Sequence, residues 1–157
     1  MDYSYGLAMG LHTLAALVWV GGMFFAHMIL RPAALDLPPP QRLALWRGVF
    51  SHFFPWVWAC ILILLATGYG VLLLGFRGGF AGGPTHVDLM QVAGLTMMVL
   101  YTQLFFGPWQ GFKRALAADE WEKAAGYQVR IRHIVTANLI LGLGTVFVGV
   151  VGSLLGT

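Results

Sequence analysis

The chain has 157 residues, of which 59% are hydrophobic and only 10% are charged. A soluble domain carries about 25% charged residues, so this composition predicts an integral membrane protein. The formal net charge of +3 does not indicate nucleic-acid binding, because the basic residues lie in the segments that connect hydrophobic stretches. The single cysteine, Cys60, excludes an internal disulfide, a CxxC redox centre and the covalent attachment of a c-type heme.

Four stretches of the sequence contain no Asp, Glu, Lys or Arg: Tyr3–Leu30, Gly48–Phe76, Leu89–Phe112 and His133–Thr157. Each exceeds the roughly 20 residues that cross a hydrocarbon core about 30 Å thick. The first stretch lacks a preceding basic region and is too long for a signal-peptide core, so we expect an uncleaved helix. The short connections leave no room for a second domain.

The predicted fold is therefore an all-α, up-down four-helix bundle in the lipid bilayer, one domain over residues 1–157. The expected spans are 4–31, 43–75, 86–112 and 129–155.

Prolines and glycines mark the expected ends and kinks of these helices. Pro32 ends the first helix, and Ala33–Pro40 is expected to form a stiff turn into the second. Pro55 lies inside the second helix and predicts a kink there. The third helix is expected to follow the glycine-rich connection Gly75–Pro84 and to begin with a capping residue, Thr85.

Further along the chain, Gly107-Pro108 predicts a kink near the end of the third helix. The segment Ala118–Arg132 is expected to be a helical extension that feeds the fourth span. The pairs Gly6–Gly10 and Gly152–Gly156 have the small-xxx-small spacing that allows helices to approach closely, which is compatible with a homodimer.

The basic residues orient the bundle. Arg77 alone lies between the second and third spans. The other eight lie in the two remaining connections and share one side of the membrane: Arg31, Arg42, Arg47, Lys113, Arg114, Lys123, Arg130 and Arg132. The positive-inside rule assigns that side to the cytoplasm. We therefore expect a multi-pass protein of a bacterial inner (plasma) membrane with both termini in the periplasm.

Five histidines lie at or inside the spans, at two depths. His12 and His86 lie toward the outer face, and His27, His52 and His133 lie toward the inner face. Ionisable groups at such depth are costly and usually functional, and histidine is a common ligand of heme iron and copper. All five are therefore candidate metal ligands, although a lone histidine near a helix end, such as His27 or His86, is as often an interfacial residue.

Helices one and three, and helices two and four, are diagonal neighbours in an up-down bundle. His12 and His86 would then face each other in the outer half, and His52 and His133 in the inner half. This arrangement suits heme b held between two histidines, with one heme expected and two if both layers bind. The remaining candidate cofactor contacts are a cavity wall at Trp19 and propionate partners at Arg130 and Arg132.

Copper is the alternative cofactor. Met9 lies one turn before His12, and Met90 lies one turn after His86, and sulfur and imidazole ligands together suit Cu(I). A third hypothesis, a structural subunit of a respiratory complex, needs no cofactor. No carboxylate lies deep in a span, so the sequence identifies no catalytic residue. If heme is bound, the expected function is electron transfer or membrane redox chemistry with a redox partner or quinone.

The first span contains Leu11-His12 followed by Trp19-Val20-Gly21-Gly22, an H-x6-W-x-[GA]-G pattern. This pattern resembles the copper resistance D (CopD) family of bacterial inner-membrane proteins and the related HemJ-type family of b-heme protoporphyrinogen oxidases. The resemblance spans the four-helix chain but is specific only in the first span. The later segments match more loosely, through Arg47 with Thr67-Gly68 and through Arg132-His133 with Asn138.

The resemblance implies a four-helix bundle and makes His12 the best candidate ligand. The HemJ-type oxidases carry a functional lysine near the start of the third helix, in an H-x-K context. The corresponding stretch in this chain is His86-Val87-Asp88. The lysine is replaced by an aspartate, which argues against protoporphyrinogen oxidation as the activity. The resemblance to the CopD family implies a role in copper uptake or delivery.

Overall fold

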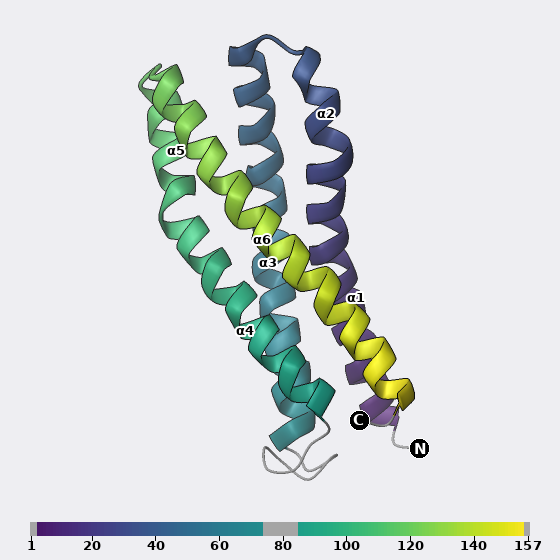
Figure 1. Ribbon diagram of the computed structural model, residues 1–157. Coiled ribbons are helices and arrows are strands. Elements are labelled where there is room, and N and C mark those ends of the chain that lie inside the picture. Colours follow the sequence, from purple (N-terminus) through teal and green to yellow (C-terminus); the bar gives the residue numbers. More distant parts are fainter. Residues whose placement is uncertain (1–2, 74–84, 156–157) are drawn as a thin grey trace.

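The chain folds into helices that run up and down the length of the molecule (Figure 1). A computed structural model describes residues 3–73 and 85–155, and no strand occurs in these two ranges. The elements are α1 (Tyr3–Phe24), a π-helix η1 (Phe25–Leu30), α2 (Arg31–Ala33), a 3-10 helix η2 (Ala34–Asp36), α3 (Pro39–Leu73), α4 (Thr85–Phe106), α5 (Pro108–Ala117) and α6 (Trp121–Leu155). The expected connection at residues 75–84 and the last residues of the second span lie outside the described ranges.

Four described segments are long and apolar enough to cross a membrane: Tyr3–Asp36, Pro39–Gly70, Thr85–Ala117 and Trp121–Leu154. Large apolar side chains on their outer faces are exposed, and lipid would cover them. The predicted all-α membrane bundle is therefore confirmed. In Figure 1, α1 begins and α6 ends at one end of the bundle, here called the terminal end. The hairpin end, at the opposite end, carries α2, η2 and the α5–α6 turn.

The helix ends follow only some of the proline and glycine signals. The prediction that Pro32 ends the first helix is wrong, because the chain stays helical through Pro32 to Asp36. Pro32 lies in the first turn of α2, directly after the π-helix, where its missing N–H is tolerated. Of the expected turn at Ala33–Pro40, only Leu37 and Pro38 are outside a helix, and α3 begins at Pro39.

Pro55 does not interrupt α3, which remains one helix through that position. The predicted break at Gly107 is confirmed, because its φ and ψ of −101° and −97° separate α4 from α5. Asp119 has a positive φ of 56° in the turn before α6.

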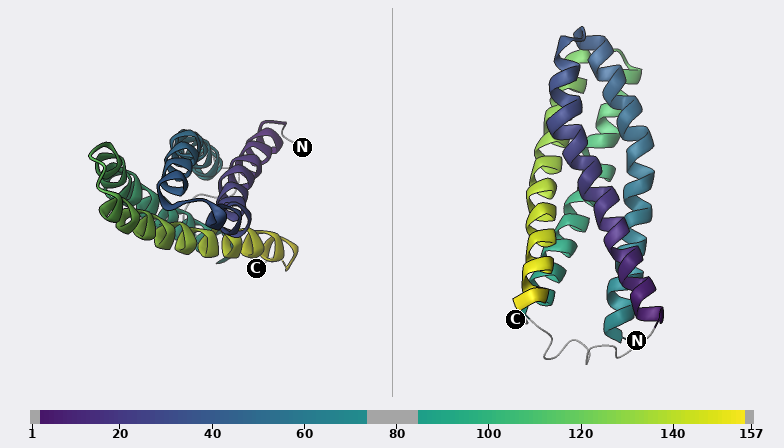
Figure 2. Two further views of the ribbon diagram at one scale, coloured as in Figure 1. Left: turned by 90° about the horizontal axis from the view of Figure 1, so that it is seen from above. Right: turned by 90° about the vertical axis from the view of Figure 1, so that its right-hand side faces the viewer.

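α6 contacts each of the other long helices of the bundle. It packs against α1 on one side and against α4 and α5 on the other, while α1 also packs against α3. Figure 2 shows α6 running obliquely across one side of the molecule. Glycine permits this close packing at Gly142, where an added Cβ would lie 2.7 Å from Val20 and 3.2 Å from Met97.

Aromatic rings fill the space between α3 and the α4–α5 pair, from the middle of the bundle toward the hairpin end. Phe54 is at the centre of this cluster, with edge-to-face contacts to Tyr101 and Trp109 at centroid separations of 5.7 and 5.2 Å. Such pairs contribute about 0.5–1.5 kcal/mol beyond their buried area. The other members of the cluster are Phe50, Trp58, Phe105 and Phe112. This half of the bundle is therefore held by a rigid aromatic core.

Candidate functional site

His12 is held by a hydrogen bond between α1 and α3. Its Nδ1 lies 2.8 Å from Oγ1 of Thr67. The same hydroxyl donates its only proton to the carbonyl oxygen of Ile63, at 2.6 Å. It must therefore accept from His12, so Nδ1 carries a proton and, in the neutral imidazole, Nε2 carries the lone pair. This is the tautomer that a metal ligand needs, with the second ring nitrogen oriented by a hydrogen bond.

The surroundings of His12 are small and apolar. Its ring Cε1 would lie 3.4 Å from a Cβ added at Gly68, so glycine leaves space beside the imidazole. Trp19, two turns further along α1, is only 2% exposed and meets Tyr101 of α4 edge-on at 6.1 Å. The imidazole itself is half-buried. The terminal half of α1 thus presents one oriented nitrogen donor beside α3, and the buried Trp19 lies about 10 Å further along the same helix.

His86 lies in the first turn of α4, as expected, and is buried at 7% exposure. Its Cβ and ring pack directly against Gly152 of α6, where any added Cβ would overlap the histidine. The described contacts therefore place His12 between α1 and α3, and His86 between α4 and α6. The sharing of one iron by the two histidines stays a prediction.

The candidates at the hairpin end are less enclosed. His52 and His133 are both exposed. His52 donates from Nδ1 to the carbonyl oxygen of Gly48 at 2.8 Å, a bond within its own helix. Among the candidate propionate partners, Arg132 is half-buried, and Arg130 is exposed with its guanidinium 5.8 Å from the ring centroid of Tyr127. No described contact joins His52 to His133.

His27 has a partner that resembles that of His12. It lies in the π-helix η1, half-buried, with Nδ1 3.4 Å from Oγ1 of Thr136 on α6. Thr136 donates its proton to the carbonyl oxygen of Arg132 at 2.8 Å, so it can only accept from the histidine. At 3.4 Å this bond is long and weak. α1 thus carries two histidine–threonine pairs, a short one toward α3 and a long one toward α6.

Sequence reasoning missed three polar residues that the structure brings into the interior. Thr67 and Thr136 are the histidine partners, and Asn138 is 2% exposed. Asn138 donates from Nδ2 to the carbonyl oxygen of Met97 at 3.3 Å, while its Oδ1 has no partner among the described residues. The sequence analysis named Thr67 and Asn138 only as loose matches to a family pattern. Their position inside apolar spans could have indicated them as interior residues, since polar side chains there usually face other helices.

No three His, Cys, Asp or Glu side chains in residues 3–73 and 85–155 form a group that could hold a metal ion. A heme iron requires only one or two axial ligands from the protein. The described residues therefore offer single histidine donors, and His12 is one that a short hydrogen bond to another helix orients.

The chain is similar to a known protein along almost its whole length. The protein is 29% identical to an uncharacterized protein of Aquifex aeolicus (strain VF5) over 151 residues, which is 96% of each chain. No family model matches the chain. No solved structure matches it. The similarity covers all four spans, and no activity is assigned to this relative.

Proposed function

We propose that this protein binds heme b in the membrane through His12 and takes part in electron transfer. The observation that supports the proposal is the bond from His12 to Thr67, because it leaves Nε2 with its lone pair. Heme b, when bound, supplies one-electron chemistry. The donor set fits this group, since an imidazole oriented by a hydrogen bond would be a suitable ligand of heme iron.

The residues of the chain have separate roles in this proposal. Thr67 fixes the orientation of the His12 ring and increases its basicity by accepting the Nδ1 proton. Gly68 lets α3 lie close beside the ring. Trp19 and Tyr101, packed edge-on, fill the bundle interior two turns further along α1. An external redox partner or a quinone would exchange the electrons.

We expect one heme per chain. His12 combines partial burial with a short hydrogen bond to another helix, whereas His52 and His133 in the hairpin half are exposed. In the two-heme alternative, Arg130 and Arg132 would contact the propionates of a second heme in the inner half. A pyridine hemochrome assay against protein concentration measures the stoichiometry, and a value near two would require a second site in the hairpin half.

The test is an optical spectrum of the protein purified in detergent, reduced and oxidised. We expect the reduced α-band of a b-type cytochrome, with the band lost in His12→Ala. His133→Ala is the matched control, because this exposed histidine should be dispensable and the variant should keep full heme occupancy. Full occupancy in His12→Ala would refute the assignment of this ligand. A colourless protein that retains copper would support copper uptake or delivery, and one without either would support a purely structural subunit.

We also propose the orientation in the membrane. Eight of the nine basic residues flank the hairpin end, and Arg77 is the exception. The positive-inside rule then puts the hairpin end in the cytoplasm of a bacterium and the terminal end in the periplasm. His12 would lie in the periplasmic half of the membrane.

A further inference from the structure

The hairpin end carries a basic cavity that the proposed heme site does not use. It has a volume of about 250 Å³ and is lined by Lys123, Gly126, Tyr127 and Arg130. These residues are spaced by one, three or four positions on α6, so they form one face of the helix over two turns. The absence of a side chain at Gly126 leaves room between the two cationic residues.

The middle of this cavity is held in place by α5. A Cβ added at Gly111 would overlap the ring of Tyr127, so the two helices are in direct contact there. The guanidinium of Arg130 lies 5.8 Å from the centroid of the same ring, in a cation–π contact. Tyr127 thus positions Arg130, and one wall of the cavity is formed before any ligand binds.

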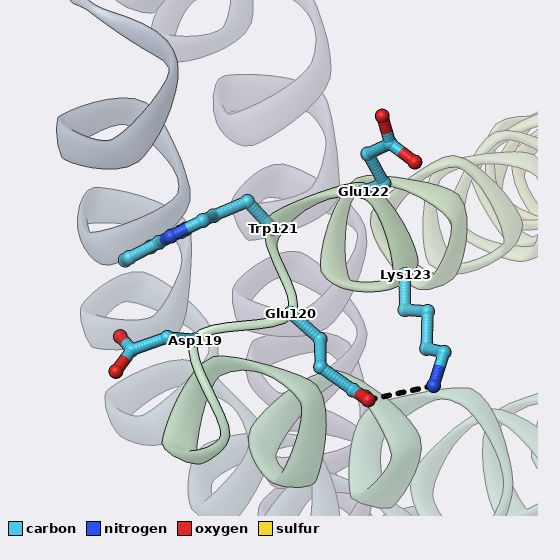
Figure 3. A pocket seen from close by; sticks show the side chains of 5 residues that line it. All are labelled: Asp119, Glu120, Trp121, Glu122 and Lys123. Atoms are coloured by element: carbon cyan, nitrogen blue, oxygen red, sulfur yellow. Dashed lines mark hydrogen bonds and ion pairs between the residues drawn. The ribbon is translucent and has the colours of Figure 1, made fainter.

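The charge of the cavity is positive. Lys123 and Arg130 are the two ionised groups that line it. Glu120 pairs with Lys123 at 2.7 Å, with side chains 44% and 68% exposed, respectively, and such an exposed pair contributes little and exchanges easily. Figure 3 shows Lys123 directed toward Glu120, while the carboxylates of Asp119 and Glu122 point away from this lysine. An anion can therefore replace Glu120 as the partner of Lys123.

The inner end of the cavity lies at the depth of lipid headgroups. The uncharged stretch of the fourth span begins at His133, three residues after Arg130 and ten after Lys123. At about 1.5 Å per residue, Arg130 lies about 4–5 Å outside this boundary and Lys123 about 15 Å outside it. The polar layer of a bilayer is roughly 5–8 Å thick on each side, so Arg130 lies within it and Lys123 lies on its aqueous side. Tyrosine is also a typical residue of this interface.

We propose that this cavity binds the phosphate group of an anionic phospholipid, held between Lys123 and Arg130, with Tyr127 as the supporting wall. Basic pockets beside membrane helices are suited to such headgroups. A phosphate has oxygens for both the forked guanidinium and the ammonium. The acyl chains would extend along the exposed apolar surface of α6 that follows Arg130 in the span, where Ile140 is 66% exposed.

The test measures binding of short-chain phosphatidylglycerol to the purified full-length protein in neutral detergent, followed by the rise in melting temperature. Short-chain phosphatidylcholine and inorganic phosphate are the comparison ligands. We expect phosphatidylglycerol to stabilise the native protein, and the double variant Lys123→Gln/Arg130→Gln to weaken its apparent affinity about tenfold or more. The double variant Lys113→Gln/Arg114→Gln, with the same loss of charge from α5, should bind like the native protein.

Equal stabilisation by phosphatidylcholine, or an equal loss of affinity in the α5 variant, would overturn the site. Stabilisation by inorganic phosphate as strong as that by phosphatidylglycerol would overturn the lipid as the source of the phosphate. Arg130→Gln alone serves as a second variant, because this exposed residue can be changed without altering the helix core, and it should already weaken binding.

Discussion

The hydroxyl of Tyr101 donates a hydrogen bond of 2.9 Å to the carbonyl oxygen of Phe54, and this bond ties α4 to α3 inside the membrane span. The ring of Tyr101 also meets Trp19 edge-on, so the same residue contacts α1. One turn earlier on α4, Met97 accepts the amide proton of Asn138 from α6. A short segment of α4 therefore links all four spans.

Tyr101→Phe should destabilise the protein by about 1 kcal/mol, since it removes this buried hydrogen bond and keeps the ring. Thermal unfolding in detergent measures the change. Tyr127→Phe is the matched control, because no described contact uses the Tyr127 hydroxyl, and its melting temperature should stay within error of the native value. Equal melting temperatures for both variants would show that the Tyr101 bond is not stabilising.

The close packing of α6 can be tested with two glycines that are two residues apart. A Cβ at Gly142 would lie 2.7 Å from Val20, whereas a Cβ at Gly144 would meet nothing within 4 Å. Gly142→Ala should therefore destabilise the bundle by about 1–3 kcal/mol through overpacking. Gly144→Ala should be neutral or slightly stabilising, because alanine favours the helix. Two variants of equal stability would contradict the described approach of α6 to α1.

The proposed orientation predicts the activity of a reporter enzyme that folds only in the periplasm. Fused after Thr157, the reporter should be active, because the terminal end faces outward. Inserted after Ala118, in the turn between α5 and α6, it should be inactive. The reverse pattern would put the basic hairpin end outside and His12 in the cytoplasmic half.

Much of the fold could be predicted from the sequence. The spans follow from gaps in the charged residues, and the kink at Gly107-Pro108 follows from backbone chemistry. The helical course through Pro32 to Asp36 and the start of α3 at Pro39, inside the expected turn, were not predicted. The π-helix η1 could not be predicted, because Phe25–Leu30 contains neither glycine nor proline. Such a bulge depends on the tertiary packing around it.

The residues that contact the candidate ligands also could not be predicted from the sequence. A membrane helix is apolar around most of its circumference, so hydrophobic periodicity does not fix how it is rotated. The depth of His12 could be predicted, but its partner Thr67 could not, since that contact depends on the rotation of α1 and α3. For the same reason, the sequence did not indicate that His86 packs against Gly152.

The bond between His12 and Thr67 leads to the most specific prediction for the proposed heme site. Thr67→Val keeps the shape of the side chain but removes the acceptor of the Nδ1 proton. Loss of such a hydrogen bond to a metal ligand typically costs about 10–100-fold in affinity. We therefore expect Thr67→Val to lower heme affinity by that factor. It should also raise the midpoint potential, because a less basic imidazole stabilises the ferric state less.

Heme titration and a redox titration of the purified variant measure the two effects. Thr67→Ser retains a hydroxyl and should restore both values toward those of the native protein. Thr96→Val is the matched control, since Thr96 is exposed on α4 and bonds only to the carbonyl oxygen of Val92 in its own helix. If Thr67→Val binds heme with native affinity and potential, Thr67 does not orient the ligand, and His12 would lose the feature that distinguishes it from the other histidines.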